Sequence, residues 1–171
     1  TGMTKQEIAM MPSLAKERFG MISDNIVMRN IMGWDIDRVD TFIDKYKFDV
    51  VFIDQGDKVG IQGSYERPDL RLRELYTHLR EVPKRNNCGL WAMSQASAEA
   101  EGKTRVTPDM MEGSKTGKFA EADLIIGSGK LPDTGDVEDP VRWWTIGKNK
   151  ITGWHGTFPV KLEKEISRYV D

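Results

Sequence analysis

Asp54 is the side chain whose position in the sequence most clearly predicts chemistry. It follows Val50-Val51-Phe52-Ile53, an apolar run without alternation that is typical of a central parallel strand buried on both faces. A carboxylate at the carboxyl end of such a strand lies where open α/β sheets bind ligands. In nucleotide-hydrolysing folds an aspartate here, the Walker B aspartate, holds the magnesium ion of the nucleotide. The alternative is a buried strand that happens to end in aspartate.

Ser94 and Gln95 follow the next apolar run along the chain, residues 88–93. A glutamine at the carboxyl edge of a parallel strand can contact a phosphate on one side and the backbone of the following loop on the other. Hydrolysis of the nucleotide would then change the conformation of that loop through the glutamine. The alternative is an ordinary strand end whose polar groups are satisfied by hydrogen bonds.

Two lysines, Lys148 and Lys150, flank Asn149 at the tip of an expected hairpin. Alternate residues of a strand point the same way, so both ammonium groups could reach one target. Cations at this position could offset charge on a phosphoryl group in transfer at a neighbouring molecule's nucleotide. A solvated hairpin tip is the alternative.

Further cations lie in or near two polar segments, residues 55–67 and 96–117. They could neutralise backbone phosphates of a nucleic acid, with little sequence readout because no aromatic residues alternate with them. A solvated surface is the alternative. The candidates are Lys58, Arg67, Lys103, Arg105, Lys115 and Lys118.

The elements that must position these residues follow an α/β order. Helical spacing, caps and apolar runs predict them one by one. The N-terminal part is predicted to contain a helix after Thr4 that Pro12 breaks, a strand at Ile26–Met28 and a helix from Asp35 to Tyr46. The central part is predicted to contain a strand at 48–53, a long helix from Pro68 and a strand at 88–93. The C-terminal part is predicted to contain a short helix at 118–121, a strand at 122–126, and paired strands at 142–147 and 155–162 joined by a turn with Gly153. This order predicts a sheet with an antiparallel edge.

Composition excludes several classes of protein. The chain has 171 residues and a formal net charge of −2, so any contact with nucleic acid must come from local basic clusters. One cysteine and two histidines exclude a disulfide framework and a zinc-type ligand set. The apolar runs are too short to span a membrane, and no signal-peptide core is present. We therefore expect no membrane partner and a cytoplasmic location.

No complete phosphate-binding loop, G-x-x-x-x-G-K-[ST], occurs in the sequence. Residues 113–118 are one residue short of this spacing, and Phe119 stands in place of the hydroxyl residue. Residues 127–130 follow a predicted strand, but Leu131 stands in place of the hydroxyl residue. We interpret both segments as ordinary turns.

The order of these motifs resembles the C-terminal two-thirds of the RecA-like ATPase domain of DnaB-type replicative helicases, including phage primase-helicases. The matching residues are Asp54, Ser94-Gln95, Ala122-Asp123 and 148–157. The resemblance implies an α/β, RecA-like three-layer sandwich with a mostly parallel central sheet and an antiparallel C-terminal hairpin. Residues 1–171 would form a single, partial domain. Its N-terminal part, with the phosphate loop and the catalytic glutamate, would precede this chain.

The resemblance also implies roles for the candidate residues. Asp54 would be the Walker B residue, holding Mg²⁺ through water; Ser94 and Gln95 would face the nucleotide, with Gln95 sensing the γ-phosphate. Lys148 and Lys150 would act on the ATP, or other NTP, of the adjacent subunit of a hexamer. Arginine is usual at the Lys150 position, and lysine lacks its bidentate fork. The two polar segments would line a channel for single-stranded DNA.

The parent enzyme would thus be a DNA helicase, and this chain by itself would hydrolyse ATP negligibly. Two alternatives remain open: a RecA or RadA-type recombinase ATPase, and a non-catalytic RecA-like binding module. The lysine-bearing hairpin favours the helicase over the recombinase. Each of these hypotheses that includes a nucleotide site requires Asp54 and Gln95 to lie side by side on adjacent strands.

Overall fold

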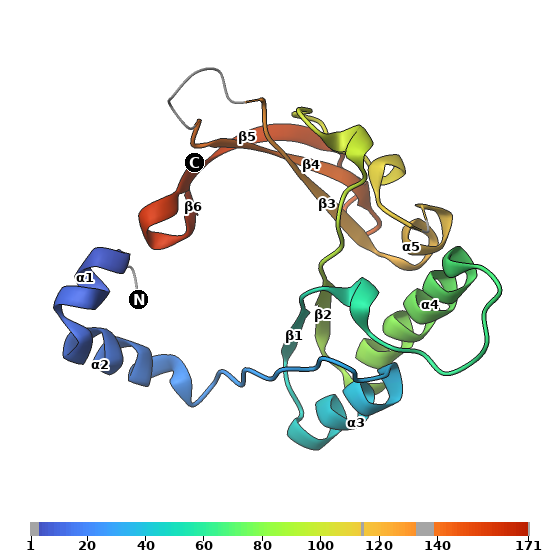
Figure 1. Ribbon diagram of the computed structural model, residues 1–171, viewed down its shortest axis with the longest axis horizontal. Coiled ribbons are helices and arrows are strands. Elements are labelled where there is room, and N and C mark those ends of the chain that lie inside the picture. Colours follow the sequence, from blue (N-terminus) through green and yellow to red (C-terminus); the bar gives the residue numbers. More distant parts are fainter. Residues whose placement is uncertain (1–3, 114, 133–138, 171) are drawn as a thin grey trace.

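The N-terminal helices of the computed structural model form an arm that lies apart from the rest of the chain (Figure 1). Thr4 caps α1 (Lys5–Met10): its hydroxyl accepts from the Glu7 amide, and the Glu7 carboxylate accepts from the Thr4 amide. The predicted capping box is therefore confirmed. Pro12 ends α1 as predicted but also begins a second helix, α2 (Pro12–Ser23), because proline fits the first turn of a helix. The structure describes residues 4–113, 115–132 and 139–170.

The strand predicted at Ile26–Met28 is wrong. These residues belong to an extended connection, and none of them is paired with another described strand. All three side chains are exposed, Met28 by 85%. An apolar, β-branched run becomes a strand only when a neighbouring backbone satisfies its hydrogen bonds, and none lies beside this one in the described chain.

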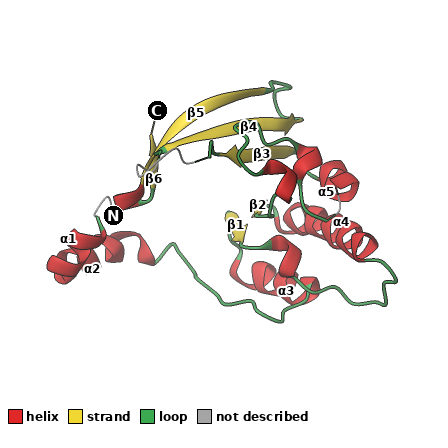
Figure 2. Ribbon diagram, turned by 45° about the horizontal axis from the view of Figure 1, so that its top comes forward, coloured by secondary structure: helices red, strands yellow, loops and turns green. Residues whose placement is uncertain are grey.

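Two helices cover one face of a parallel pair of strands (Figure 2). The helices are α3 (Ile36–Tyr46) and α4 (Pro68–Asn86); the strands are β1 (Val50–Ile53) and β2 (Gly89–Ala92), paired in parallel with Ile53 opposite Ala92. Asp35 caps α3 as predicted, accepting from the Arg38 amide at 2.9 Å. The buried core between these elements consists of Trp34, Ile36, Val39, Ile43, Ile53, Val59, Leu75, Leu79 and Val82.

The second face of this strand pair is open, contrary to the prediction that β1 is buried on both faces. Val50 is 50% exposed and Phe52 64% exposed, while Ile53 on the helix-covered face is 2% exposed. The Phe52 ring stacks on Trp91 of β2, with centroids 6.3 Å apart, and Trp91 is itself 45% exposed. Apolar residues on both faces of a strand indicate two covering layers, and the described chain supplies one of them.

The chain from residue 124 onward forms a second, four-stranded antiparallel sheet in the order β3-β4-β5-β6. Its strands are β3 (Leu124–Gly129), β4 (Val141–Asn149), β5 (Gly156–Glu163) and β6 (Arg168–Val170). The predicted hairpin of β4 and β5 is confirmed, with Gly153 at φ +75° in its turn. β6 was not predicted. Among the described strands, parallel pairing is confined to β1 and β2.

The helix α5 (Lys115–Glu121) precedes β3 and packs beside α4 (Figure 1). Part of the long segment between β2 and α5 packs directly against β3. A Cβ atom at Gly127 would overlap the carbonyl of Val106, and one at Gly129 would overlap the carbonyls of Lys103 and Thr104. None of the described helices combines the length and apolar character that crossing a bilayer requires.

Candidate functional site

Asp54 directly follows β1, and Gln95 follows the end of β2, so both come after adjacent parallel strands at the same carboxyl edge, where the sequence predicts them. The Met93 amide donates to the carbonyl of Ile53 at 2.9 Å, which continues the β1–β2 ladder past its last paired residues. The Gly56 amide then donates to the carbonyl of Met93, also at 2.9 Å. The residues after β1 and after β2 are thereby joined at the carboxyl edge, where open α/β sheets bind ligands.

A cleft of about 520 Å³ opens beside Asp54. It is lined by the segment before α3 and by the turn after β1, which brings two cations, Arg29 and Lys58, to the same cleft as the Asp54 carboxylate. Asp54 and Lys58 are both exposed. Sequence reasoning missed Arg29, because the segment 29–33 has no motif and comes to this edge only through the fold.

A polar network centred on Asp57 lies next to this edge, and within it Lys118 is buried whereas Ser94 is exposed. One carboxylate oxygen of Asp57 accepts from the Tyr76 hydroxyl at 2.8 Å. The other accepts from the Ser94 hydroxyl at 2.8 Å and from the Lys118 ammonium at 2.9 Å. Burial, reinforced by the Asp57 charge, raises the pKa of the Tyr76 hydroxyl well above its ordinary value. Arg71 donates to the carbonyl of Asp57 at 2.9 Å and fixes the turn to α4.

Two predicted site residues, Ser94 and Lys118, belong to this network and make contacts other than those predicted for them. Ser94 was predicted to face a nucleotide, but its hydroxyl donates to Asp57 and accepts from Lys118 at 2.8 Å. Lys118 was predicted to contact DNA, yet its side chain is 2% exposed. A polynucleotide phosphate cannot reach an ammonium group that is enclosed in this way, so the geometry does not support Lys118 as a DNA contact. Sequence reasoning missed Asp57 and Tyr76, which no motif singles out.

Lys148 and Lys150 lie together beside the end of α5. The Lys148 ammonium donates to the carbonyls of Phe119 and Ala120 and lies 4.4 Å from the Phe119 ring centroid. The Lys150 ammonium donates to the Asp123 carboxylate at 3.3 Å. Burial, followed by repulsion from Lys150, lowers the pKa of Lys148. Within the described chain, neither lysine contacts Asp54 or Gln95.

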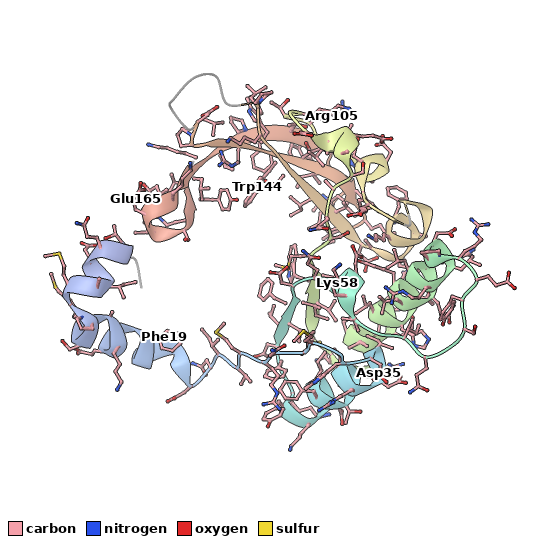
Figure 3. The ribbon with its side chains drawn as sticks, in the orientation of Figure 1. Phe19, Asp35, Lys58, Arg105, Trp144 and Glu165 are labelled. Atoms are coloured by element: carbon pink, nitrogen blue, oxygen red, sulfur yellow. The ribbon has the colours of Figure 1, made fainter. Side chains whose placement is uncertain are left out.

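The remaining predicted DNA contacts do not form one patch. Figure 3 shows Lys58 beside the parallel strands and Arg105 on the four-stranded sheet, well apart. Arg67 forms a bidentate pair with Asp69, at 2.8 and 3.0 Å. Lys103 is exposed, as is Arg105. The remaining candidate, Lys115, has a side chain outside the part of the chain that the structure describes.

The residues at this edge fit one part of a magnesium–nucleotide site. The exposed carboxylate of Asp54 suits a magnesium ion held through water, and Gln95 lies at the same carboxyl edge of the strand pair. No group of three or more His, Cys, Asp or Glu side chains able to hold a metal ion occurs in the described residues, so further ligands would have to come from nucleotide and water. The sequence offers no complete glycine-rich cradle for the phosphates.

Comparisons with known proteins agree on the fold. No protein-family model and no curated protein sequence matches this chain. Among solved structures, a DnaB-like replicative helicase studied with its interactions with primase superposes with a TM-score of 0.78 at 18% identity, over 91% of this chain and 40% of that one. A second solved structure, an isolated ATPase domain, superposes with a TM-score of 0.71 at 16% identity, over 81% of this chain and 51% of that one. This chain therefore has the RecA-like α/β fold of the ATPase domain of DnaB-like replicative helicases and spans about half or less of those chains.

Proposed function

We propose that this chain is part of the motor domain of an ATP-dependent replicative DNA helicase, whose NTP hydrolysis drives translocation along single-stranded DNA. The observation that carries the proposal is that Asp54 and Gln95 both follow the carboxyl ends of two adjacent parallel strands. In the fold of replicative-helicase ATPase domains, this edge is where a nucleotide is expected to bind.

Asp54 and Gln95 have distinct roles in this proposal. Asp54 orients the magnesium ion of the nucleotide through water, and the bound ion neutralises charge on the phosphates. Gln95 contacts the γ-phosphate, and loss of that phosphate on hydrolysis changes the position of the loop that follows Gln95. Two backbone contacts support this path: the Glu112 amide donates to the carbonyl of Gln95 at 3.1 Å, and the Ser97 amide donates to that of Met110 at 2.7 Å.

The lysine pair at the end of β4 acts between subunits in this proposal. In a hexamer, Lys148 and Lys150 present their charges to the nucleotide of the adjacent subunit and stabilise charge on the phosphoryl group. Lys150 is 42% exposed and supports the intersubunit role best. Both lysines would have to exchange their contacts around α5 for the nucleotide, because their ammonium groups already have partners in this chain.

DNA binding rests on exposed cations of the two polar segments. Lys103 and Arg105 lie in the longer segment and Lys58 in the shorter one, with Arg67 and Lys115 as further candidates. They would contact backbone phosphates and leave sequence unread. We expect such a motor to work in the cytoplasm of a bacterial or phage-infected cell.

The hydrolysis site is tested by exchanging aspartates at the two ends of β1. In the longer parent protein, Asp54→Ala should reduce NTP hydrolysis to background, because the magnesium ion loses its carboxylate. Asp49→Ala is the matched control: Asp49 is an exposed aspartate at the opposite end of the same strand and should leave hydrolysis unchanged. Full activity of the Asp54→Ala protein would contradict the proposed site.

A second measurement concerns the 171-residue chain alone. We expect negligible turnover, because its sequence holds no complete phosphate-binding loop. Robust turnover by this chain that Asp54→Ala abolishes would show that the residues present here suffice. Turnover that persists in Asp54→Ala would point to a contaminating enzyme.

A further inference from the structure

Lys118 is the one buried lysine identified in the described chain, and it joins three separate segments. It belongs to α5, and its ammonium group donates to Asp57 in the turn after β1 at 2.9 Å. It also donates to the hydroxyl of Ser94 after β2 at 2.8 Å, and to the carbonyl of Glu112 before α5 at 2.6 Å. An ammonium group has three N–H donors, so these three oxygens satisfy it.

The partners of Lys118 are themselves held in place. Asp57 accepts from the Tyr76 hydroxyl, and its backbone carbonyl accepts from Arg71, so α4 anchors the turn from below. Tyr76 also presents its ring 5.4 Å from the Lys118 ammonium. A buried charge with a compensating carboxylate and a full set of hydrogen bonds has one favourable geometry, since any displacement leaves a buried polar group unpaired.

The same ammonium group reaches the segment that closes the long loop. The amide of Glu112 donates to the carbonyl of Gln95, and Ala96 forms an antiparallel bridge with Met111. The two ends of the loop are therefore joined by a few backbone contacts. Lys118 adds a buried tether at this point, to the Glu112 carbonyl on one side and to Ser94 on the other.

We propose that Lys118 is a positioning residue that locks the Ser94–Gln95 end of β2 and the loop end at Glu112 onto the turn that follows Asp54. Through this lock, the position of Gln95 is coupled to the loop between residues 96 and 113. The consequence for hydrolysis rests on the proposed function, whereas the lock is a property of this chain and is tested on it without nucleotide or DNA.

Hydrogen–deuterium exchange of the 171-residue chain tests the lock. In Lys118→Met, amides of residues 94–97 and 110–113 should exchange about tenfold faster or more, beyond any change caused by the loss of global stability. Val82→Ala is the matched control, since it destabilises the core of α4 without touching the network. Lys103→Met controls for the loss of one exposed lysine in the loop.

Each outcome decides for or against the lock. Selective acceleration in Lys118→Met but not in Val82→Ala supports it, and equal profiles in the two variants overturn it. If Lys118→Met does not fold, the double variant Lys118→Met with Asp57→Asn removes both charges of the pair and should fold. Faster exchange at 94–97 and 110–113 in the double variant supports the lock, and exchange like that of the unmodified chain overturns it.

Discussion

Tyr76→Phe is the change that most directly measures the polar network behind the candidate site. It removes a single oxygen atom, the hydroxyl that donates to Asp57 at 2.8 Å, and keeps the ring that packs against the core. The Asp57 side chain is 18% exposed, so water does not fully replace the lost donor. A hydrogen bond to a charged group contributes about 1.5–3 kcal/mol, and we expect this loss of stability at pH 7.

The same substitution should lose its effect at alkaline pH. Burial, reinforced by the Asp57 charge, raises the pKa of Tyr76 above its ordinary value of 10.0, so the folded chain retains a proton that the unfolded chain loses. Stability from such a group is complete below the unfolded pKa and falls as pH rises above it, by about 1.4 kcal/mol per pH unit. The phenylalanine variant has no such phenol to titrate, so the two proteins should become equally stable at a pH of about 11 to 12.

The assay is urea unfolding followed by tryptophan fluorescence at a series of pH values from 7 upward. Tyr46→Phe is the matched control, because Tyr46 is 49% exposed on α3 and its described contacts involve its ring. It should shift the urea midpoint at pH 7 little. A difference between Tyr76→Phe and the unmodified chain that stays constant up to pH 12, or no difference at pH 7, would refute this reasoning.

Three further predictions concern the exposed strand face, the hairpin tip and the N-terminal arm. Phe52→Ser combined with Trp91→Ser should reduce binding of an apolar fluorescent dye without lowering the urea midpoint, since both rings lie on the uncovered face; a lower midpoint would show that this face contributes to the core. Asn149→Ala removes four hydrogen bonds that shape the turn after β4, and should accelerate exchange of the turn amides while the rest of the sheet stays protected. Thr4→Ala should weaken α1 by about 1 kcal/mol, seen as a smaller helical circular-dichroism signal at an unchanged urea midpoint, because the arm lies apart from the core.

Elements that depend on short-range signals were predictable from the sequence. The capping box at Thr4, the cap at Asp35 and the glycine turn at Gly153 each act within a few residues, so the sequence contains the whole interaction. The placement of Asp54 and Gln95 at the same edge of the strand pair was also predictable. Consecutive parallel strands that end in polar residues present them at the same edge, whatever else the fold contains.

The tertiary structure alone decided the surroundings of that edge. The ion pair of Lys118 with Asp57 joins residues 61 positions apart, and neither residue lies in a pattern that distinguishes a buried lysine from a solvated one. The failure at Ile26–Met28 has a related cause, because an apolar run becomes a strand only if a partner backbone lies beside it. Local sequence therefore determined the type of most elements and which residues end the strands. Burial, ion pairing and the open face of β1 were determined by long-range packing, since they depend on segments that meet only in the folded chain.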